Sequence, residues 1–459
     1  MTKITISHLS FAYRKKDLII KDLNLEIPAG LSLLTGPTGY GKSTLLKLIA
    51  GLYPKYAGHR NGQIVLNGLT KAMMFQNPAE QFTMETPREE IIFALENLGL
   101  NKDEYERKLG FAVKFSQIGK LLDQKIITLS GGEKQRVALA VLVAMDVDLL
   151  LLDEPFASVD PEARKFLIEK LSELKNLGKT IIISDHVFDD YRNIYDHVFS
   201  FKNQTVYELS SEETRKLFDI KASNKKTIFA LPTLNSAKVF SLKNTEIKQN
   251  RPLLKQDDLK IYKGKITLIT GPNGVGKSSF FKALTKMIPY EGSMTFENQE
   301  IAKLKARKYL LHVAQIFQSA DDQFLAVTVQ DELNLSKKDR NPYFTDERIK
   351  EALKLLDLDT HLDQVVYSLS GGQKKKLQIL LMLITKHEVL LIDEPLSGLD
   401  KNSIKQVIQL MREVQKSLRQ TFLIISHQID ELADLCDYRL NFDHQQLNYV
   451  SEAPYESKS

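Results

Sequence analysis

Gly36-Pro-Thr-Gly-Tyr-Gly-Lys-Ser-Thr44 decides the fold, because the same pattern returns as Gly271-Pro-Asn-Gly-Val-Gly-Lys-Ser-Ser279. In both copies an apolar, strand-like segment precedes the glycines and a helical pattern follows them. Glycines at these spacings let backbone N–H groups turn inward around a phosphate, and the helix N-terminus adds positive potential. A plain glycine turn before a helix is the alternative, but two copies with matching sequels argue against it. We therefore expect two phosphate-binding loops.

Four other blocks recur in the same order at an interval of roughly 240 residues, the length of a domain. The repeated pairs are Phe75-Gln-Asn-Pro-Ala-Glu-Gln81 with Phe317-Gln-Ser-Ala-Asp-Asp-Gln323, Leu129-Ser-Gly-Gly-Glu-Lys134 with Leu369-Ser-Gly-Gly-Gln-Lys374, Leu149-Leu-Leu-Leu-Asp-Glu-Pro155 with Val389-Leu-Leu-Ile-Asp-Glu-Pro395, and Ser184-Asp-His186 with Ile425-Ser-His427. The chain is therefore a tandem repeat. We predict a first domain over 1–220, a linker over 221–235 and a second domain over 236–459.

Each half has the pattern of an α/β domain. Leu149–Leu152 and Val389–Ile392 are unbroken apolar runs, typical of parallel strands covered on both faces. The helix after the first loop should stop at Gly51, and the helix after the second should cover Ser278–Met287. The predicted fold is two tandem P-loop domains, each with a mainly parallel core sheet, an antiparallel β edge and a helical subdomain.

An acidic pair ends a buried strand in each half, Asp153-Glu154 and Asp393-Glu394. Open α/β sheets place their ligands at the carboxyl ends of strands. An aspartate there can hold magnesium, and a glutamate can act as general base on an attacking water. An exposed acidic strand end is the alternative, which the two phosphate loops disfavour.

The Leu-Ser-Gly-Gly blocks are the most specific in the sequence. Ser130 with Glu133, and Ser370 with Gln373, each satisfy a capping box, so a helix should begin at both places. A capped helix that starts in two glycines also leaves amides and a positive dipole end directed at whatever faces it. We expect both properties to hold.

The five blocks in this order resemble the ATP-binding-cassette superfamily, and the resemblance covers nearly the whole chain twice. It implies ATP hydrolysis with ATP and Mg2+ as cofactors, and an intramolecular pairing of the two cassettes. In that pairing each Ser-Gly-Gly motif completes the ATP site of the other cassette. Site one would join Lys42, Asp153 and Glu154 to Ser370 and Gly372, and site two would join Lys277, Asp393 and Glu394 to Ser130 and Gly132.

The resemblance also assigns roles to individual residues. The catalytic residues would be Glu154, Glu394, His186, His427, Gln76 and Gln318. Magnesium would be held, through ATP and water, by Ser43, Gln76, Asp153, Ser278, Gln318 and Asp393. ATP would be bound by Tyr13, Gly36, Pro37, Thr38, Gly39, Tyr40, Gly41, Lys42, Ser43, Thr44, Ser130, Gly131, Gly132, Gly271, Pro272, Asn273, Gly274, Val275, Gly276, Lys277, Ser278, Ser279, Ser370, Gly371 and Gly372. Asp160 and Asp400 would close loops that face the opposite cassette.

Tyr13 ends a run of alternating apolar residues, so core packing explains it as well as a binding role does. The family places an aromatic residue that stacks on adenine at this point. In the second half, the alignment of Ser241-Leu-Lys-Asn244 puts Asn244 at the matching position. We therefore expect no platform at Asn244, with Phe240 as the other aromatic candidate.

Composition limits the setting in which the chain works. The net charge of +5 is small for a chain of 459 residues, so charge alone neither favours nor excludes a nucleic-acid partner. A single cysteine, Cys436, indicates a reducing compartment, and the N-terminus lacks the apolar core of a signal peptide. Apolar runs stay far below the ~20 residues that cross a bilayer. Work at a membrane would therefore need a partner.

Phe-Gln-x4-Gln, the Thr-x-x-Glu-Glu that follows it and Glu96-Asn-Leu-Gly-Leu100 are similar to the ATPases of energy-coupling-factor (ECF) transporters, in particular the form with both cassettes on one chain. This resemblance implies a peripheral protein on the cytoplasmic face of the membrane. Its partners would be a transmembrane coupling subunit and a substrate-binding membrane subunit that import a vitamin or a transition-metal ion, and no direct contact with nucleic acid is expected.

Other cassette proteins are alternatives. A soluble tandem-cassette ATPase acting on ribosomes would need a long charged helical linker, for which 216–236 is too short. DNA-repair cassettes carry zinc-binding cysteines or long coiled coils, and neither pattern is present. Fused ATPases of sugar importers typically have one degenerate site, whereas both glutamates and both histidines are found in this chain.

The contact with a membrane subunit is expected beside Gln76 and Gln318, at four apolar residues flanked by polar ones. These are Phe82, Met84, Phe324 and Leu325. Packing against their own helical region is the alternative for each of them.

Overall fold

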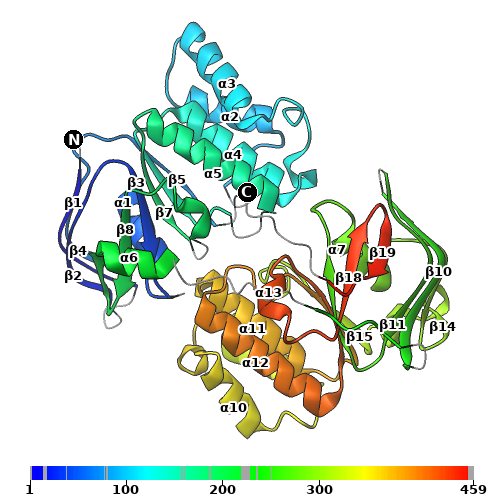
Figure 1. Ribbon diagram of the computed structural model, residues 1–459. Coiled ribbons are helices and arrows are strands. Elements are labelled where there is room, and N and C mark those ends of the chain that lie inside the picture. Colours follow the sequence, from blue (N-terminus) through cyan, green and yellow to red (C-terminus); the bar gives the residue numbers. More distant parts are fainter. Residues whose placement is uncertain are drawn as a thin grey trace. The chain divides into compact units, whose positions relative to one another are not determined.

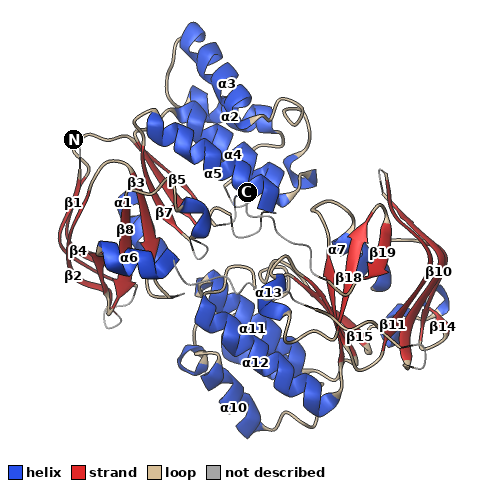
Figure 2. Ribbon diagram, in the orientation of Figure 1, coloured by secondary structure: helices blue, strands red, loops and turns tan. Residues whose placement is uncertain are grey.

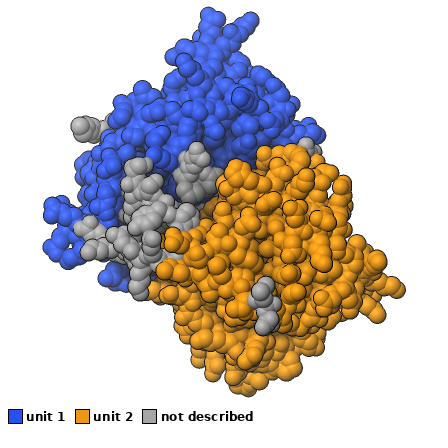
Figure 3. Space-filling model, turned by 45° about the vertical axis from the view of Figure 1, so that its right-hand side comes forward, with its two compact units in different colours: residues 1–222 blue, residues 223–459 orange. Residues whose placement is uncertain are grey.

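The computed structural model describes residues 3–13, 18–37, 39–76, 78, 81–156, 159, 161–185, 188–218, 228–233, 236–249 and 251–452. The chain divides into two compact units, residues 1–222 and residues 223–459, which are coloured separately in Figure 3. Both units have the same architecture of a core sheet, a second sheet and a group of helices (Figures 1 and 2).

The core sheet of unit 1 has six strands, parallel except for the last pair. In spatial order they are β5 (Lys71–Met74), β6 (Leu149–Asp153), β7 (Thr180–Ser184), β3 (Leu31–Thr35), β8 (His197–Lys202) and β9 (Thr205–Glu208). Strands β3, β6 and β7 are buried along their whole length, as expected for parallel strands covered on both faces. An antiparallel sheet of β2 (Leu18–Ile27), β1 (Ile4–Ala12) and β4 (His59–Val65) forms the predicted β edge.

Unit 2 repeats this order of strands. Its core sheet consists of β15 (Val313–Ile316), β16 (Val389–Asp393), β17 (Thr421–Ile425), β12 (Ile266–Thr270), β18 (Tyr438–Asp443) and β19 (Gln446–Tyr449). Its antiparallel sheet consists of β11 (Pro252–Tyr262), β10 (Lys238–Lys248), β13 (Glu291–Phe296) and β14 (Gln299–Glu300). The predicted fold, a mainly parallel sheet with an antiparallel edge in each half, is confirmed.

The helices of unit 1 are α1 (Lys42–Ala50), α2 (Pro87–Glu96), α3 (Lys102–Ser116), α4 (Gly131–Met145), α5 (Pro161–Asn176) and α6 (Ser211–Phe218). Those of unit 2 are α7 (Lys277–Leu284), α8 (Ala306–Tyr309), α9 (Val329–Lys337), α10 (Asp346–Leu355), α11 (Gly371–Ile384), α12 (Lys401–Leu418) and α13 (Ile429–Leu432). In Figure 2 the helices α2, α3 and α4, which form the helical subdomain of unit 1, lie to one side of its strands.

Local sequence sets the ends of these helices. Both predicted capping boxes are present, at Ser130 on α4 and at Ser370 on α11, and α1 ends at Gly51 in the left-handed conformation. The prediction for α7 is wrong at its C-terminus, because the helix ends at Leu284 and not at Met287. Lys286, two residues after Leu284, has a left-handed φ of 61°, and a right-handed helix cannot continue through this conformation.

Candidate nucleotide sites

The phosphate loop of unit 1 joins β3 to α1 at the carboxyl end of the sheet. Gly41 has a φ of 111°, and a Cβ there would lie 2.7 Å from the Ile19 side chain. The position therefore requires glycine. Lys42 is buried, and its Nζ donates hydrogen bonds to the carbonyl oxygens of Gly36 at 2.8 Å and Pro37 at 3.1 Å. The lysine amine thus lies at the mouth of the loop, while Thr38 falls outside the described residues.

The loop of unit 2 has the same geometry. Lys277 Nζ donates to the carbonyl oxygens of Gly271 at 2.7 Å and Pro272 at 2.9 Å, and Gly276 has a φ of 117°. Both predicted loops therefore exist as folded turns ahead of helix N-termini, with their amides available to an anion.

A serine hydroxyl contacts the buried aspartate of the acidic pair in each unit. Ser43 Oγ donates to Asp153 Oδ1 at 3.0 Å, and Ser278 Oγ donates to Asp393 Oδ2 at 2.7 Å. Burial raises the pKa of both aspartates; at Asp153 the charge of Glu154 raises it further. A carboxylate beside a hydroxyl in a buried position is stabilised when a cation is present.

The glutamate that follows each aspartate has an unusual backbone. Glu154 has a φ of 44° and Glu394 a φ of 48°, a region that non-glycine residues seldom adopt and that is found at functional sites. Glu154 Oε2 accepts a hydrogen bond from Gln76 Nε2 at 2.9 Å, which brings these two predicted catalytic residues together. The side chain of Gln318, by contrast, makes no hydrogen bond to Glu394 in the described structure.

Glu394 has a different partner. Ser426 Oγ donates to its Oε2 at 3.1 Å, and burial, more than the neighbouring charge of Asp393, raises the pKa of Glu394 to about 7. A carboxylate with a pKa near neutrality is suited to take a proton from water.

His427 lies between the phosphate loop and the glutamate in unit 2. Its Nε2 is 2.9 Å from Asn273 Oδ1 and 3.7 Å from Glu394 Oε1. The structure therefore brings His427, Glu394 and the phosphate loop together. His186, the matching residue of unit 1, lies outside the described residues, as does Asp160.

The two Leu-Ser-Gly-Gly blocks, residues 129–132 and 369–372, are called the signature motifs below, and the serine of each caps a helix. The Ser130 hydroxyl accepts a bond from the Glu133 amide, and the Ser370 hydroxyl accepts one from the Gln373 amide. The capping interpretation is thus correct for both serines. A contact of Ser130, Gly131, Gly132, Ser370, Gly371 and Gly372 with the opposite cassette stays a prediction.

Tyr13 lies next to the phosphate loop of unit 1. Its hydroxyl is 2.9 Å from Thr44 Oγ1, and its ring packs edge-on against the rings of Phe11 and Tyr53. The residue is still 43% exposed, which leaves part of the side chain open to a ligand. Tyr13 can therefore both pack and stack.

The prediction that Asn244 occupies the position of Tyr13 in unit 2 is wrong. Asn244 has a φ of 45° in the middle of β10, and a Cβ on Gly292 would meet its carbonyl oxygen. His8, with a φ of 49°, stands in the same relation to Gly62 in unit 1. Both residues form the bulge of their strand, so His8 matches Asn244. Counting five residues on from each bulge pairs Tyr13 with Gln249.

The described residues of unit 2 that match Phe11, Tyr13 and Tyr53 carry no aromatic rings. Gln249 is exposed, Ile247 replaces Phe11 and Ile288 replaces Tyr53. Phe240, the other candidate, is wholly buried in the core and offers no face to a ligand. Instead, Arg251 Nη2 donates to the carbonyl oxygen of Gly274 in the phosphate loop at 2.7 Å.

Sequence reasoning missed the residues that hold the loop after Gln76. Gln81 accepts a hydrogen bond from the Phe75 amide and donates to the Met73 carbonyl, both at 2.8 Å. The buried carboxylate of Glu90 accepts from the two amides that follow Phe82. Gln323 and Glu332 repeat these bonds in unit 2. The recurrence of Phe-Gln-x4-Gln was the signal that could have revealed them.

The predicted docking residues divide between core and surface. Phe324 is 7% exposed and packs in the core of the helical subdomain, so its assignment to a surface patch is wrong. Leu325 is 87% exposed, and Val327 beside it is also exposed. Phe82 is half-buried and lines a cavity of about 240 Å³ with Met73 and Met74.

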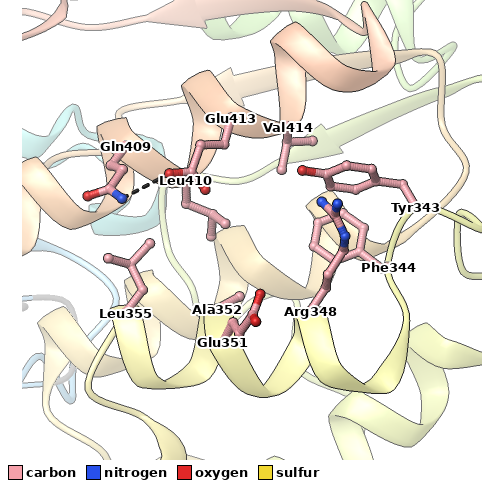
Figure 4. Close-up of a pocket in the computed structure, with 10 residues that line it drawn as sticks. All are labelled: Tyr343, Phe344, Arg348, Glu351, Ala352, Leu355, Gln409, Leu410, Glu413 and Val414. Atoms are coloured by element: carbon pink, nitrogen blue, oxygen red, sulfur yellow. Dashed lines mark hydrogen bonds between the residues drawn. The ribbon is translucent and has the colours of Figure 1, made fainter.

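A second cavity of about 240 Å³ lies between α10 and α12 of unit 2 (Figure 4). Figure 4 shows the Arg348 guanidinium over the Tyr343 ring, 4.0 Å from its centroid, and a hydrogen bond from Gln409 to Glu413. No residue of a phosphate loop lines this cavity, so it is separate from the candidate nucleotide sites.

Comparison with known proteins identifies the family. The ABC transporter family matches residues 20–157 and 254–397, which contain both phosphate loops and both acidic pairs. A putative ABC transporter ATP-binding protein of Treponema denticola is 30% identical over 468 residues, covering 94% of each chain. The putative HMP/thiamine import ATP-binding protein YkoD of Bacillus subtilis is 28% identical and covers 95% of this chain and 88% of that one.

Solved structures share the fold. A chain in the crystal structure of archaeal ribosomal stalk protein aP1 with ribosome recycling factor aABCE1 covers 98% of this chain and 90% of its own, with a TM-score of 0.62 and 20% identity. A chain in a model of ribosome-bound archaeal Pelota and ABCE1 has a TM-score of 0.70 at 18% identity. The match covers 98% of this chain and 78% of that chain. Every helix among the described residues is too short or too polar to traverse a bilayer. The chain belongs to the ABC transporter family and carries two of its ATP-binding cassettes in tandem.

Proposed function

We propose that this chain is the ATP-hydrolysing energy-coupling subunit of an ECF-type importer, driving uptake of a vitamin or a transition-metal ion through separate membrane subunits. One observation carries the hydrolytic part: both units keep the serine–aspartate pair and the glutamate in its left-handed conformation. Two intact sets support turnover at both sites, which disfavours an ATPase with one degenerate site.

Magnesium fits the residues present. Hydroxyl and carboxylate oxygens are the ligands that this ion prefers, and it usually takes one or two carboxylates together with substrate phosphates. The described residues contain no cluster of three or more metal-binding side chains, so a site completed by ATP suits them. Ser43 with Asp153, and Ser278 with Asp393, would hold the ion. When bound, it would neutralise charge on the transferring phosphate.

The remaining residues would act on the phosphates and on water. Lys42 and Lys277 would exchange their carbonyl partners for phosphate oxygens, which attract an ammonium group more strongly. Glu394, with a pKa near 7, would take the proton of the attacking water, and Glu154 would do the same in unit 1 with Gln76 as its neighbour. His427 would contact the γ-phosphate from the side of Asn273.

We further propose that the cassettes pair head-to-tail. The capped starts of α4 and α11 expose glycine amides at a positive helix end, which is suited to a phosphate supplied by another surface. Ser370 and Gly372 would then complete site one, and Ser130 and Gly132 would complete site two.

The importer assignment is supported by the relative named for HMP/thiamine import and by the exposed apolar residues beside the loop of Gln318. Leu325 and Val327 would receive a short amphipathic helix of a membrane subunit, with apolar anchors giving affinity. In unit 1 the cavity beside Phe82 would serve the same purpose.

Co-purification from detergent-solubilised membranes tests this proposal. The wild-type chain should bring down membrane proteins, and Leu325→Asp should lose them while its basal ATP hydrolysis persists. Leu177→Asp is the control, because Leu177 is 61% exposed on the loop between α5 and β7. Equal recovery of membrane proteins by both variants would place the docking surface elsewhere.

The alternative is a tandem-cassette ATPase that acts on ribosomes or nucleic acid. It is raised by the solved structures of ribosome recycling factors, which at 18–20% identity share the fold alone. Sedimentation through sucrose gradients separates the two functions. ATP-dependent comigration with ribosomes, without recovery of membrane proteins, would replace the importer proposal.

A further inference from the structure

Lys375 is a buried lysine on α11, five residues beyond the signature serine of unit 2. It is 4% exposed, and its Nζ donates to the carbonyl oxygens of Gln318 at 2.7 Å and Phe317 at 3.3 Å. Burying an ammonium group is costly unless it is paired and hydrogen-bonded. Two backbone carbonyls of one loop provide such bonds, and the charges of Asp393 and Glu394 act on the same ammonium.

The next turn of α11 adds a second connection to the same loop. Gln378 Nε2 donates to the Phe317 carbonyl at 3.0 Å and to Gln323 Oε1 at 2.8 Å. Lys374 Nζ, at the edge, donates to Asp321 Oδ1 at 2.7 Å. Three side chains within five residues of one helix thus hold the loop that carries Gln318.

Among the residues of unit 1 that the structure describes, these connections are absent at the matching positions. Gln135 replaces Lys375, and its Oε1 is buried without a hydrogen-bond partner. Within the described part of unit 1, Gln135 donates no bond to residue 75 or 76. Ala138 replaces Gln378, and its methyl group lines the cavity beside Phe82. A cavity therefore adjoins the position in unit 1 that matches Gln378.

We infer that Lys375, supported by Gln378, is a positioning residue that fixes the backbone at Gln318 and so presents Gln318 to the nucleotide site of unit 2. Because Ser370 is the N-cap of α11, the same bonds connect the Leu-Ser-Gly-Gly block of unit 2 to the Gln318 loop. Among the described residues of unit 1, α4 makes no equivalent bonds to the backbone at Gln76, whose side chain donates to Glu154 instead, so the two glutamines are held in different ways. The inference rests on the proposed hydrolysis at both sites.

Lys375→Met tests the inference, because methionine keeps the length and removes the donors. In a Glu154→Gln background, turnover reports on site two. Losing charge-assisted bonds to a catalytic loop should lower kcat roughly 10- to 100-fold, with KM for ATP changed by less than about threefold. Removing the ammonium leaves the Gln318 carbonyl oxygen without this donor, which costs about 1–3 kcal/mol, so kcat should be measured well below the lowered melting temperature. Lys375→Arg should restore part of kcat, which a merely structural role would not predict.

Gln135→Met in a Glu394→Gln background is the matched control and should change kcat at site one by less than about threefold. A kcat of Lys375→Met within threefold of its parent would overturn the inference. So would a loss of kcat that arises from unfolding of the variant at the assay temperature and is not restored by arginine.

Hydrogen exchange gives a readout that does not depend on hydrolysis. Without nucleotide, Lys375→Met should raise exchange at the amides of 317–323 roughly tenfold or more, and unchanged exchange would overturn the inference. If Lys375→Met fails to fold, Lys375→Gln, which carries the residue of unit 1, takes its place in both measurements. Should Glu154→Gln with Glu394→Gln keep full turnover while exchange responds as expected, the proposed hydrolytic roles fail and the positioning of the loop stands.

Discussion

Removing the ring of Tyr13 should weaken ATP binding at one site only. Tyr13 is 43% exposed, its ring packs edge-on against the rings of Phe11 and Tyr53, and its hydroxyl is 2.9 Å from Thr44 Oγ1. A base stacked on an aromatic ring contributes about 1–3 kcal/mol. Tyr13→Ala should therefore raise the Kd for ATP at site one roughly 5- to 150-fold, since each 1.4 kcal/mol is a factor of ten. Tyr13→Phe should cost much less, because it removes only the hydroxyl.

Equilibrium binding with a fluorescent ATP analogue, displaced by ATP or GTP, measures this effect. Lys277→Ala isolates site one and Lys42→Ala isolates site two. We expect site two to discriminate less between ATP and GTP, and Gln249→Tyr to tighten ATP binding there. A Kd for Tyr13→Ala within twofold of its parent, or equal selectivity at both sites, would refute the stacking role.

Three further predictions concern other parts of unit 1. Arg164→Met leaves Asp185 buried without the guanidinium that lies 2.9 Å away, and should lower the free energy of unfolding of unit 1 by about 3 kcal/mol, as measured by calorimetry. Gln81→Ala removes the two side-chain hydrogen bonds to the backbone of Phe75 and Met73 and should lower kcat at site one more than it raises KM in steady-state assays. Ser43→Ala should raise the Mg2+ concentration for half-maximal hydrolysis at site one roughly tenfold, as a magnesium titration would show, because one of two oxygen ligands is lost.

The core of both sites could be predicted because its determinants are local. A phosphate loop needs glycines at fixed spacings, and a capping box needs two residues three apart, so Gly41 and Ser130 could be placed without tertiary information. The acidic pairs follow apolar strands that are buried along their whole length. In these segments local preference and tertiary structure agree.

Residues whose position depends on register could not be placed. The alignment that matched Tyr13 with Asn244 is wrong by five residues, because only strand pairing shows that the bulge at Asn244 corresponds to the bulge at His8. The loop that contains Phe324 and Leu325 has no regular period, and therefore the sequence could not tell which of the two faces the core. The link from Lys375 to Gln318 joins segments that only folding brings together.

The central claim is that Glu154 and Glu394 drive ATP hydrolysis at two sites, and phosphate release tests it most directly. The rate should be measured for the wild type, for Glu154→Gln, for Glu394→Gln and for the double variant, with ATP binding followed in the same samples. Loss of a general base slows a reaction by roughly 10²- to 10⁴-fold, so the double variant should bind ATP and release phosphate at that reduced rate. Phosphate release by the double variant within threefold of the wild-type rate would contradict the account.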